Sequence, residues 1–348
     1  MEQPDIRAVA RSMMAAGKGL LAIDESTGTC DKRFASAGIA RTAEMRRAYR
    51  DLLVTTPGLG ASISGAILYD ETIRQQTLDG RSFVAALNAA GILPGIKVDL
   101  GAVELAGHPG ERVTEGLDGL RQRLQDYRAM GARFAKWRAV LAIGEGLPST
   151  ACIEVNAHAL ARYAALCQEA GLVPIVEPEV LMDGDHTLAR CAAVTQEVLH
   201  RVFDQLHVQG VLLEAMILKP NMVLPGLACP VQESVQEVAA ATLQSLLRTV
   251  PGAVAGIAFL SGGQSGDLAS ARLNAMDSSQ GPAHAGLPWP LTFSFGRALQ
   301  EPALEIWAGM SENRTAAQQA LLRRARDNAA ALRGAFCPGV ERACSHDH

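Results

Sequence analysis

The stretch Val211-Leu212-Leu213-Glu214-Ala215-Met216-Ile217-Leu218-Lys219-Pro220-Asn221 gives the strongest indication of the fold. Up to Leu218 it is mostly apolar, and such a run is typical of a parallel strand that is buried on both faces. The run ends in Lys219, and Pro220 is expected to stop the strand. Because a buried ammonium group is costly unless it is paired or neutralised, this lysine is the first candidate functional residue.

Lys219 can be interpreted in two ways. One interpretation is a lysine that reaches solvent at the end of a strand. The other is a desolvated amine that attacks a carbonyl group and forms a Schiff base. Lysine usage favours the second interpretation, because only five of the 32 lysine and arginine residues are lysines, yet Lys97, Lys136 and Lys219 all end strand-like apolar runs.

Similar apolar runs alternate with helical patterns along the chain. We expect strands at 19–23, 63–69, 93–98, 133–141, 172–176, 211–218, 254–260 and 291–295. We expect helices at 6–14, 42–55, 81–90, 117–130, 152–170, 185–207 (capped by Asp185), 234–249, 267–276 and 315–335. This alternation predicts an α/β fold, a single (β/α)₈ TIM barrel over residues 1–337 with an extra N-terminal helix and a loose C-terminal tail at 338–348. A doubly wound open sheet is the alternative, but no Gly-x-Gly-x-x-Gly follows the first strand.

Composition narrows the classes of function. The chain has 348 residues, 48% of them hydrophobic and 20% charged, and its net charge of −4 does not favour a nucleic-acid partner. Seven cysteines occur without a Cys-x-x-Cys motif, which suggests free thiols in a reducing compartment. No apolar run is long enough for a signal peptide or a membrane span, so we expect a cytoplasmic protein with no membrane partner.

Polar residues gather where the predicted strands end. The carboxyl ends of barrel strands meet at one mouth, and active sites lie there. Seven of the eight predicted strands deliver an ionisable or hydroxyl group to it: Asp24, Lys97, Lys136, Arg138, Glu177, Glu179, Lys219, Ser261 and Arg297. Cations and carboxylates alternate in this set, so they can shift one another's pKa.

A phosphate site is expected after the seventh and eighth strands, where barrels commonly bind phosphate. Ser261-Gly262-Gly263 and Ser294-Phe295-Gly296-Arg297 follow those strands. Small residues allow backbone N–H groups to close around an anion, and Arg297 adds a charged fork. Ser-Gly-Gly alone would be an ordinary turn.

At these positions the chain resembles the class I, Schiff-base fructose-bisphosphate aldolases. The matching stretches keep the order of the family and span about residues 5 to 335: 21–28, 95–99, 134–138, 174–179, 218–223, 259–265 and 293–300. The resemblance implies reversible cleavage of fructose 1,6-bisphosphate to dihydroxyacetone phosphate and glyceraldehyde 3-phosphate in glycolysis and gluconeogenesis. It also implies a sugar bisphosphate as substrate, no cofactor, no metal and a homotetramer.

The resemblance also implies a role for each site residue. Lys219 is similar to the Schiff-base lysine, Glu177 to the general acid/base, and Asp24 to the carboxylate that assists C3–C4 cleavage. Lys136 and Glu179 resemble the electrostatic partners around the lysine. The remaining positions fall into two phosphate subsites: Ser261, Gly262, Gly263, Ser294, Gly296 and Arg297 for the C1 phosphate, and Ser26, Thr29, Arg33 and Lys97, with Arg138 nearby, for the C6 phosphate.

The C-terminus departs from the family. Eukaryotic members commonly end in a tyrosine that exchanges the enamine proton, whereas this chain ends Cys344-Ser345-His346-Asp347-His348. One hypothesis is that His346 or His348 exchanges that proton, because an imidazole can give and take a proton near neutral pH. The alternative is an inert end.

Three alternative functions fit these residues less well than a class I aldolase does. A metal-dependent aldolase would need ligands at metal spacing, and the eight histidines form no His-x-x-x-His motif. Another Schiff-base barrel, such as a transaldolase-like or deoxyribose-phosphate aldolase, would not need the second phosphate subsite. A non-catalytic scaffold would not need Lys219, Glu177 and Asp24. The choice among fructose 1,6-bisphosphate, fructose 1-phosphate and sedoheptulose 1,7-bisphosphate stays open.

Overall fold

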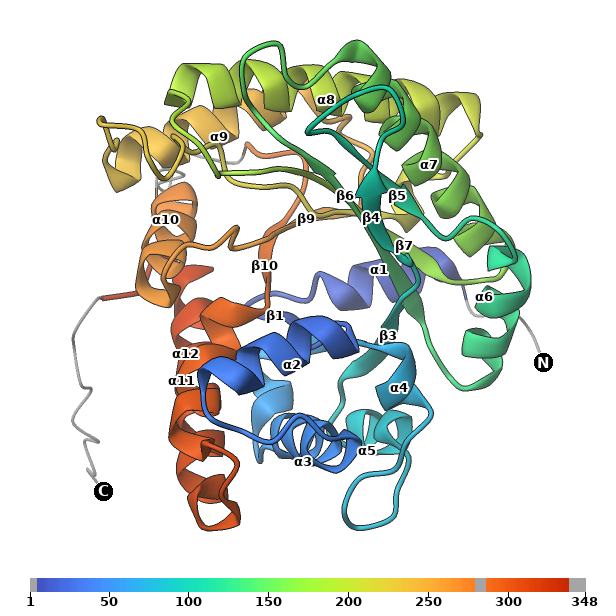
Figure 1. Cartoon of the computed structure of the whole chain (residues 1–348), viewed down its shortest axis with the longest axis vertical. Helices are drawn as coiled ribbons and strands as arrows, with labels where there is room; N and C mark the ends of the chain where they lie inside the picture. Colours follow the sequence, from blue (N-terminus) through green and yellow to red (C-terminus); the bar gives the residue numbers. More distant parts are fainter. Residues whose placement is uncertain (1–4, 279–285, 338–348) are drawn as a thin grey trace.

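Short apolar runs become the parallel strands of a closed barrel in the computed structural model, which describes residues 5–278 and 286–337 (Figure 1). In order around the ring they are β1 (Gly19–Ala22), β10 (Leu291–Phe295), β9 (Gly256–Phe259), β8 (Ile217–Leu218), β7 (Val173–Val180), β6 (Phe134–Leu141), β3 (Leu93–Lys97) and β2 (Ile63–Leu68). β2 closes the ring by pairing with β1. The predicted TIM barrel is confirmed.

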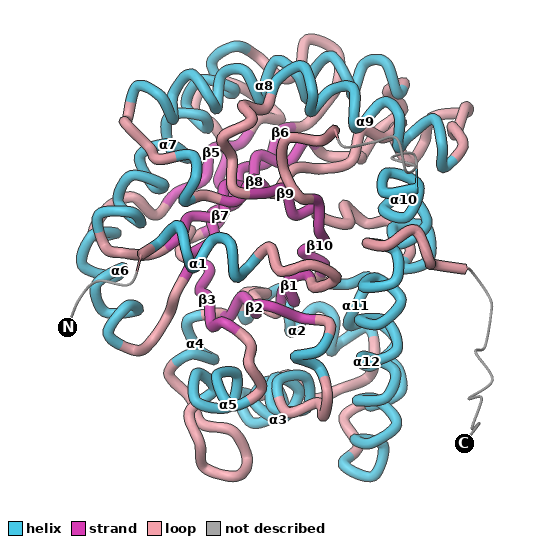
Figure 2. Tube along the Cα trace, turned by 180° about the vertical axis from the view of Figure 1, so that it is seen from behind, coloured by secondary structure: helices cyan, strands magenta, loops and turns pink. Residues whose placement is uncertain are grey.

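Helices surround the ring (Figures 1 and 2). They are α1 (Ile6–Met13), α2 (Thr27–Ser36), α3 (Ala43–Val54), α4 (Asp70–Ile73), α5 (Phe83–Ala89), α6 (Leu120–Ala129), α7 (Thr150–Glu169), α8 (Leu188–Val208), α9 (Val235–Thr249), α10 (Gly266–Ser278), α11 (Arg297–Trp307) and α12 (Arg314–Ala331), with 3₁₀ turns η1 (Leu59–Ala61), η2 (Leu213–Ala215) and η3 (Ser311–Asn313). Within the described ranges, no helix combines the length and the apolar character that crossing a membrane requires.

Several helices begin at side-chain caps that the sequence supplies. Ser234 starts α9 with a reciprocal capping box, in which the Ser234 hydroxyl accepts the Glu237 N–H and the Glu237 carboxylate accepts the Ser234 N–H. Thr42, Ser82 and Ser149 each accept one backbone N–H at the starts of α3, α5 and α7. These caps explain why the predicted starts of these helices lie close to the observed ones.

Alternation along the strands divides the barrel interior into an apolar floor and a charged mouth. Side chains two residues apart point to the same face of a strand. On β6, Phe134 therefore lies below Lys136, and on β7 Ile175 lies below Glu177. Phe134 and Ile175 belong to a buried apolar cluster with residues of α1, which lies across the lower end of the barrel (Figure 2). The charged groups thus stand on an apolar base.

Phe134 occupies the centre of this floor because glycines leave space for it. A Cβ atom built on Gly95 would lie 2.1 Å from Cε2 of Phe134, and one on Gly65 would lie 3.0 Å from Cε1. Both glycines are in neighbouring strands, β3 and β2. Glycine at these two positions is therefore a packing requirement.

The predicted strand at 211–218 is wrong over most of its length. Only Ile217–Leu218 form β8, and η2 lies before them. The side chain of Gln168 on α7 donates to the carbonyls of Leu212 and Ala215 and accepts the N–H of Leu212, so this backbone does not need a neighbouring strand. The apolar pattern predicted a strand that is buried throughout, whereas Leu212 and Leu213 are partly buried and Glu214 is exposed.

Other differences concern caps and missed elements. Thr187, and not Asp185, caps α8, because the Thr187 hydroxyl accepts the N–H of Arg190. β7 extends to Val180, so Glu177 and Glu179 lie within the strand and point into the barrel. The sequence prediction missed α2, α11 and the antiparallel hairpin of β4 (Gly101–Glu104) and β5 (Arg112–Glu115). The predicted tail at 338–348, with its histidines, lies outside the described residues.

Candidate active site

Two lysines and two carboxylates lie together at the carboxyl ends of four barrel strands, β1, β6, β7 and β8. Lys136 comes from β6, Glu177 from β7, Lys219 from the residue after β8, and Asp24 from just after β1. The backbone N–H of Lys219 donates to the carbonyl of Val176 on β7 at 2.8 Å, which continues the strand pairing by one residue. This bond fixes the start of the Lys219 side chain beside Glu177.

The four groups form a continuous row of ion pairs. Lys219 Nζ lies 3.0 Å from Glu177 Oε1, and Lys136 Nζ lies 2.7 Å from Glu177 Oε2. Lys136 Nζ also donates to Asp24 Oδ2 at 3.0 Å. Lys219 and Glu177 are each 3% exposed and Lys136 is 4% exposed, so water screens these charges weakly.

Burial and the neighbouring charges oppose each other in setting the protonation of this row. Burial alone would raise the pKa of Asp24, but Lys136 and Lys219 outweigh it and hold that pKa well below its ordinary value. The same balance lowers the pKa of Glu177. Burial would lower the pKa of Lys136, yet Asp24 and Glu177 raise it far above the ordinary range. The carboxylates are therefore ionised and Lys136 is charged at neutral pH.

Glu179 is placed differently from Glu177 although both point into the barrel. Its carboxylate accepts a hydrogen bond from Nε of Arg138, which follows Lys136 on the inner face of β6. Arg138 carries the more exposed side chain of the pair, at 42% against 9% for Glu179. Glu179 thus orients an arginine at the mouth, and it pairs with Arg138 and not with a lysine.

The loop after β9 and the start of α11 form the expected anion-binding corner. Gly262 and Gly263 have φ angles of +57° and +84°, which residues with a side chain adopt rarely. Gly263 faces the Arg297 guanidinium, since a Cβ atom there would lie 3.3 Å from Nη2. Ser294 is 1% exposed and its hydroxyl has no hydrogen-bond partner among the described residues. The Ser294 hydroxyl, the Arg297 guanidinium and the N-terminus of α11 together suit a phosphate group, because each can donate a hydrogen bond to it.

The opposite side of the mouth carries the residues predicted for the second phosphate. Ser26 caps α2 by accepting the Thr29 N–H, which brings Ser26 and Thr29 together at the start of that helix. Arg33 lies one turn further along α2 and pairs with the buried carboxylate of Glu25. Lys97 ends β3, and its Nζ lies 2.6 Å from Asp99 Oδ1. These cations are already paired, which orders them.

All these groups line one cavity of about 1100 Å³ at the mouth. Every residue that the sequence predicted for the site belongs to its lining: Asp24, Ser26, Thr29, Arg33, Lys97, Lys136, Arg138, Glu177, Glu179, Lys219, Ser261, Gly262, Gly263, Ser294, Gly296 and Arg297. A cavity of this size accommodates a ligand larger than a single phosphate.

Glu25 and Asp99 also support this lining, although the sequence did not predict them as site residues. Glu25 joins Arg33 to the buried Arg50 and also accepts a hydrogen bond from Gln300. Asp99 holds Lys97. Glu25 and Asp99 each lie within two residues of a predicted site residue and inside the stretches that resemble the family, but neither signal gave them a role. Glu25 finds its partners Arg50 and Gln300 on α3 and α11, which are distant in the chain, so the sequence alone could not connect them.

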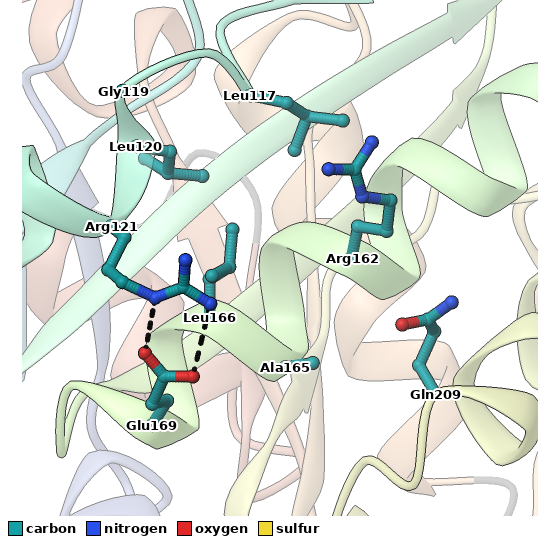
Figure 3. A pocket seen from close by; sticks show the side chains of 9 residues that line it. All are labelled: Leu117, Gly119, Leu120, Arg121, Arg162, Ala165, Leu166, Glu169 and Gln209. Atoms are coloured by element: carbon teal, nitrogen blue, oxygen red, sulfur yellow. Dashed lines mark hydrogen bonds and ion pairs between the residues drawn. The ribbon is translucent and has the colours of Figure 1, made fainter.

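A second, smaller cavity lies outside the barrel, between α6, α7 and the turn after α8 (Figure 3). Its volume is about 370 Å³. Arg121 and Glu169 pair along one wall, with Arg121 Nε 2.6 Å from Glu169 Oε1, and Arg162 lines another part of the cavity (Figure 3). Its described lining contains no lysine, histidine, cysteine or serine, so this cavity lacks the groups for covalent chemistry.

Histidines and cysteines contribute little to the mouth. Across residues 5–278 and 286–337, no group of three or more histidine, cysteine, aspartate or glutamate side chains is arranged to hold a metal ion. The cysteines at positions 30, 152, 167, 191 and 229 are buried and unpaired, and Cys337 is exposed. Burial raises the pKa of Cys30, Cys152, Cys167 and Cys191, which makes these thiols poor nucleophiles.

Comparison with known sequences finds one family over almost the whole chain. Residues 5–348 match the family model described as fructose-bisphosphate aldolase class-I. A relative from Xanthomonas axonopodis pv. citri, named probable fructose-bisphosphate aldolase class 1, is 57% identical over 93% of this chain and 96% of its own length. The cytosolic fructose-bisphosphate aldolase 5 of Arabidopsis thaliana is 52% identical over 95% of this chain and 91% of its own length.

A solved structure extends the similarity to three dimensions. The fructose-bisphosphate aldolase of Plasmodium falciparum, crystallised with TRAP and a small-molecule inhibitor, superposes with a TM-score of 0.93 at 48% identity. The match covers 96% of this chain and 95% of that one.

Proposed function

This chain belongs to the class I fructose-bisphosphate aldolases, which reversibly cleave fructose 1,6-bisphosphate through a lysine Schiff base, and we propose that Lys219 forms that Schiff base here. The chain is thus a glycolytic lyase whose products are dihydroxyacetone phosphate and glyceraldehyde 3-phosphate. The residue assignment is supported above all by the contact between the 3%-exposed Lys219 amine and Glu177 Oε1 at 3.0 Å. A nucleophile next to a proton acceptor is the arrangement that imine formation requires.

Glu177 is proposed as the group that moves protons during imine formation. Its lowered pKa keeps it ionised in the free site, so it can take a proton from the Lys219 ammonium. The neutral amine then attacks C2 of the substrate, and one proton of the attached nitrogen passes to the former carbonyl oxygen to give the carbinolamine. Glu177 protonates this hydroxyl, which leaves as water, and the protonated imine remains. Once Lys219 is neutral, one of the cations that lower the pKa of Glu177 is gone, so Glu177 holds the transferred proton more readily.

Asp24 and Lys136 are proposed to act in cleavage. Asp24 accepts the proton of the C4 hydroxyl, the C3–C4 bond breaks, and its electrons move into the iminium group to give an enamine. Lys136 stays charged because Asp24 and Glu177 raise its pKa, so it holds both carboxylates in place and serves as a fixed positive charge. Lys136 is therefore a poor candidate for the nucleophile.

The two phosphates are assigned to opposite sides of the mouth. Ser261, Gly262, Gly263, Ser294, Gly296 and Arg297 would bind the C1 phosphate, and Ser26, Thr29, Arg33 and Lys97, with Arg138, would bind the C6 phosphate. The Ser294 hydroxyl, which has no hydrogen-bond partner in the part of the chain that the structure describes, and the Gly263–Arg297 approach support the first assignment. Glu179 holds Arg138 toward the second. Two anion sites flanking one amine favour a bisphosphate over a deoxyribose-phosphate or transaldolase-like substrate.

Borohydride trapping tests the assignment of the nucleophile. Reduction in the presence of dihydroxyacetone phosphate is expected to fix a three-carbon adduct on the peptide that carries Lys219. Lys219→Arg should abolish the adduct, while Lys136→Arg, which retains the charge, should slow cleavage but still give it. An adduct on Lys97 or Lys136 would refute the mechanism.

We further propose that the protein is a cytoplasmic homotetramer built from one barrel, residues 1–337, with a tail at 338–348. The cytosolic name of the Arabidopsis relative and the family itself support this proposal. Light scattering of the purified protein at several concentrations tests the tetramer; a mass of one or two chains would contradict it.

A further inference from the structure

Asp99 is a buried carboxylate at the mouth to which the mechanism above assigns no role. It lies two residues after Lys97, which ends β3, and just before the β4–β5 hairpin. Its side chain is only 3% exposed, whereas the side chain of Lys97 beside it is 15% exposed. Asp99 therefore lies deeper in the wall than the lysine that it contacts.

The oxygens of Asp99 connect three segments. Oδ1 lies 2.6 Å from Lys97 Nζ, and Lys97 Nζ also donates to the backbone carbonyl of Asp99 at 3.2 Å. Oδ1 accepts the N–H of Gly101 and Oδ2 accepts the N–H of Arg138, each at 3.2 Å. One carboxylate thus fixes the amine of Lys97, the start of the hairpin and the backbone of Arg138.

These contacts bear on the two cations assigned to the C6 phosphate. An ammonium group has three donors; Lys97 gives one to the backbone carbonyl of Asp99 and pairs with the Asp99 carboxylate, so it keeps donor capacity for a ligand. Arg138 is fixed at its backbone by Asp99 and at its guanidinium by Glu179. A lysine side chain loses much rotamer freedom when it binds, and prior ordering removes that cost from substrate binding.

We propose that Asp99 is a positioning residue that sets where Lys97 and Arg138 meet the C6 phosphate of the substrate. The inference rests on the proposed phosphate assignment and deepens it. An opposing effect exists, because the charge of Asp99 repels a phosphate. The ammonium of Lys97 is nearer the cavity than the carboxylate and is paired to it, so the loss of order outweighs the gain in net charge when Asp99 is neutralised.

Asp99→Asn separates the two effects when two substrates are compared. Fructose 1,6-bisphosphate carries the C6 phosphate, and fructose 1-phosphate does not. We expect KM for the bisphosphate to rise about tenfold with kcat changed less than about twofold, and KM for fructose 1-phosphate to change less than about twofold. An unchanged or lower KM for the bisphosphate, or equal increases for both substrates, would overturn the proposal.

Two further variants keep the test decisive. Lys97→Met removes the cation and keeps the length of the side chain, so it must raise KM for the bisphosphate selectively if the phosphate assignment is right. If Lys97→Met acts selectively and Asp99→Asn does not, the role of Asp99 is refuted while the assignment stands. If Lys97→Met is not selective, the assignment itself fails.

Asp99→Glu addresses folding. It keeps the buried charge and displaces it by one methylene group, so a KM between those of the native enzyme and Asp99→Asn is expected, again only for the bisphosphate. Circular dichroism and melting temperatures of the variants establish that the comparison is made on folded protein. If Asp99→Asn does not fold, the bisphosphate selectivity of Asp99→Glu decides the question: a selective rise supports positioning, and none refutes it.

Discussion

Replacing Glu177 by glutamine tests the core of the site. Glutamine keeps the size of the side chain but cannot take a proton from Lys219 or return one to the departing hydroxyl. Loss of one general acid/base slows turnover by about 10²–10⁴-fold, or about 3–5 kcal/mol of transition-state stabilisation. The phosphates are held by other residues, so KM for fructose 1,6-bisphosphate should change far less than kcat.

The structure also predicts a cost in stability for the same change. The Glu177 carboxylate contacts both buried lysines, Lys219 at 3.0 Å and Lys136 at 2.7 Å. After its replacement by glutamine, Lys136 still pairs with the carboxylate of Asp24. Removing one partner of a buried ion pair costs about 3–5 kcal/mol because a buried charge is left uncompensated. We therefore expect lower unfolding midpoints in urea as well as slow turnover.

The assay combines steady-state cleavage, borohydride trapping and urea unfolding. Glu179→Gln is the matched control, because Glu179 lies two residues along the same strand but pairs with Arg138. That control should reduce kcat by less than about tenfold, since it removes no proton carrier from Lys219. If Glu177→Gln raises KM strongly and leaves kcat intact, or if both variants behave alike, the reasoning about Glu177 is refuted.

Three further results are expected. First, the pKa of Asp24 in the folded protein lies below its ordinary value of 3.8, so the stabilisation by ionised Asp24 is complete above that pH and is lost as the pH falls toward the folded value. The melting temperature of Asp24→Asn should therefore depend less on pH between 7 and 2.5 than that of the native protein, and an unchanged profile would contradict the ion-pair row. Second, Gly95→Ala should destabilise the protein by about 1–3 kcal/mol or more through overpacking against Phe134, whereas Gly28→Ala on α2, with no atom within 4 Å of the new Cβ, should be nearly neutral in the same urea titration. Third, if His346 or His348 exchanges the enamine proton, removing residues 344–348 should slow tritium exchange from dihydroxyacetone phosphate more than it slows trapping on Lys219; equal exchange rates would assign that proton to another group.

The barrel could be predicted from the sequence because its strands are buried on both faces. Runs such as those ending at Lys97 and Lys136 show that burial directly, and the positions of β3 and β6 agree with the prediction. The run before Lys219 shows the limit of this argument. Burial of its last four residues was predicted correctly, but the turn before them was not, because Gln168 satisfies that backbone from a helix that lies elsewhere in the chain.

The missed helices have a different cause. α2 and α11 begin within the polar stretches that follow β1 and β10, where glycine and serine resemble loop residues. α2 has a negative mean hydropathy, so its buried residues Cys30 and Phe34 give only a weak helical pattern. The glycine and serine residues expected to bind phosphate therefore made the starts of α2 and α11 look like loops in the sequence.

The candidate site residues could be selected from the sequence, but their pairings could not. Both Glu177 and Glu179 point into the barrel, and position alone does not tell which of them touches Lys219. The structure separates them through the positions of Lys136 and Arg138, which sit two residues apart on β6. Strand order and barrel geometry, which are properties of the whole chain, decide those distances.

The pairing of the first strand with the last has a consequence for synthesis of the protein. β1 meets β10 at Leu20 and Ser294, so the first strand closes the ring against residues that are made about 270 positions later. A ribosome that has released the chain up to residue 280 has already produced Lys136, Glu177 and Lys219, but two strand edges are still unpaired and prone to associate with other chains. Closure of the ring therefore also completes the anion-binding corner, because Ser294, Gly296 and Arg297 are supplied by β10 and the start of α11.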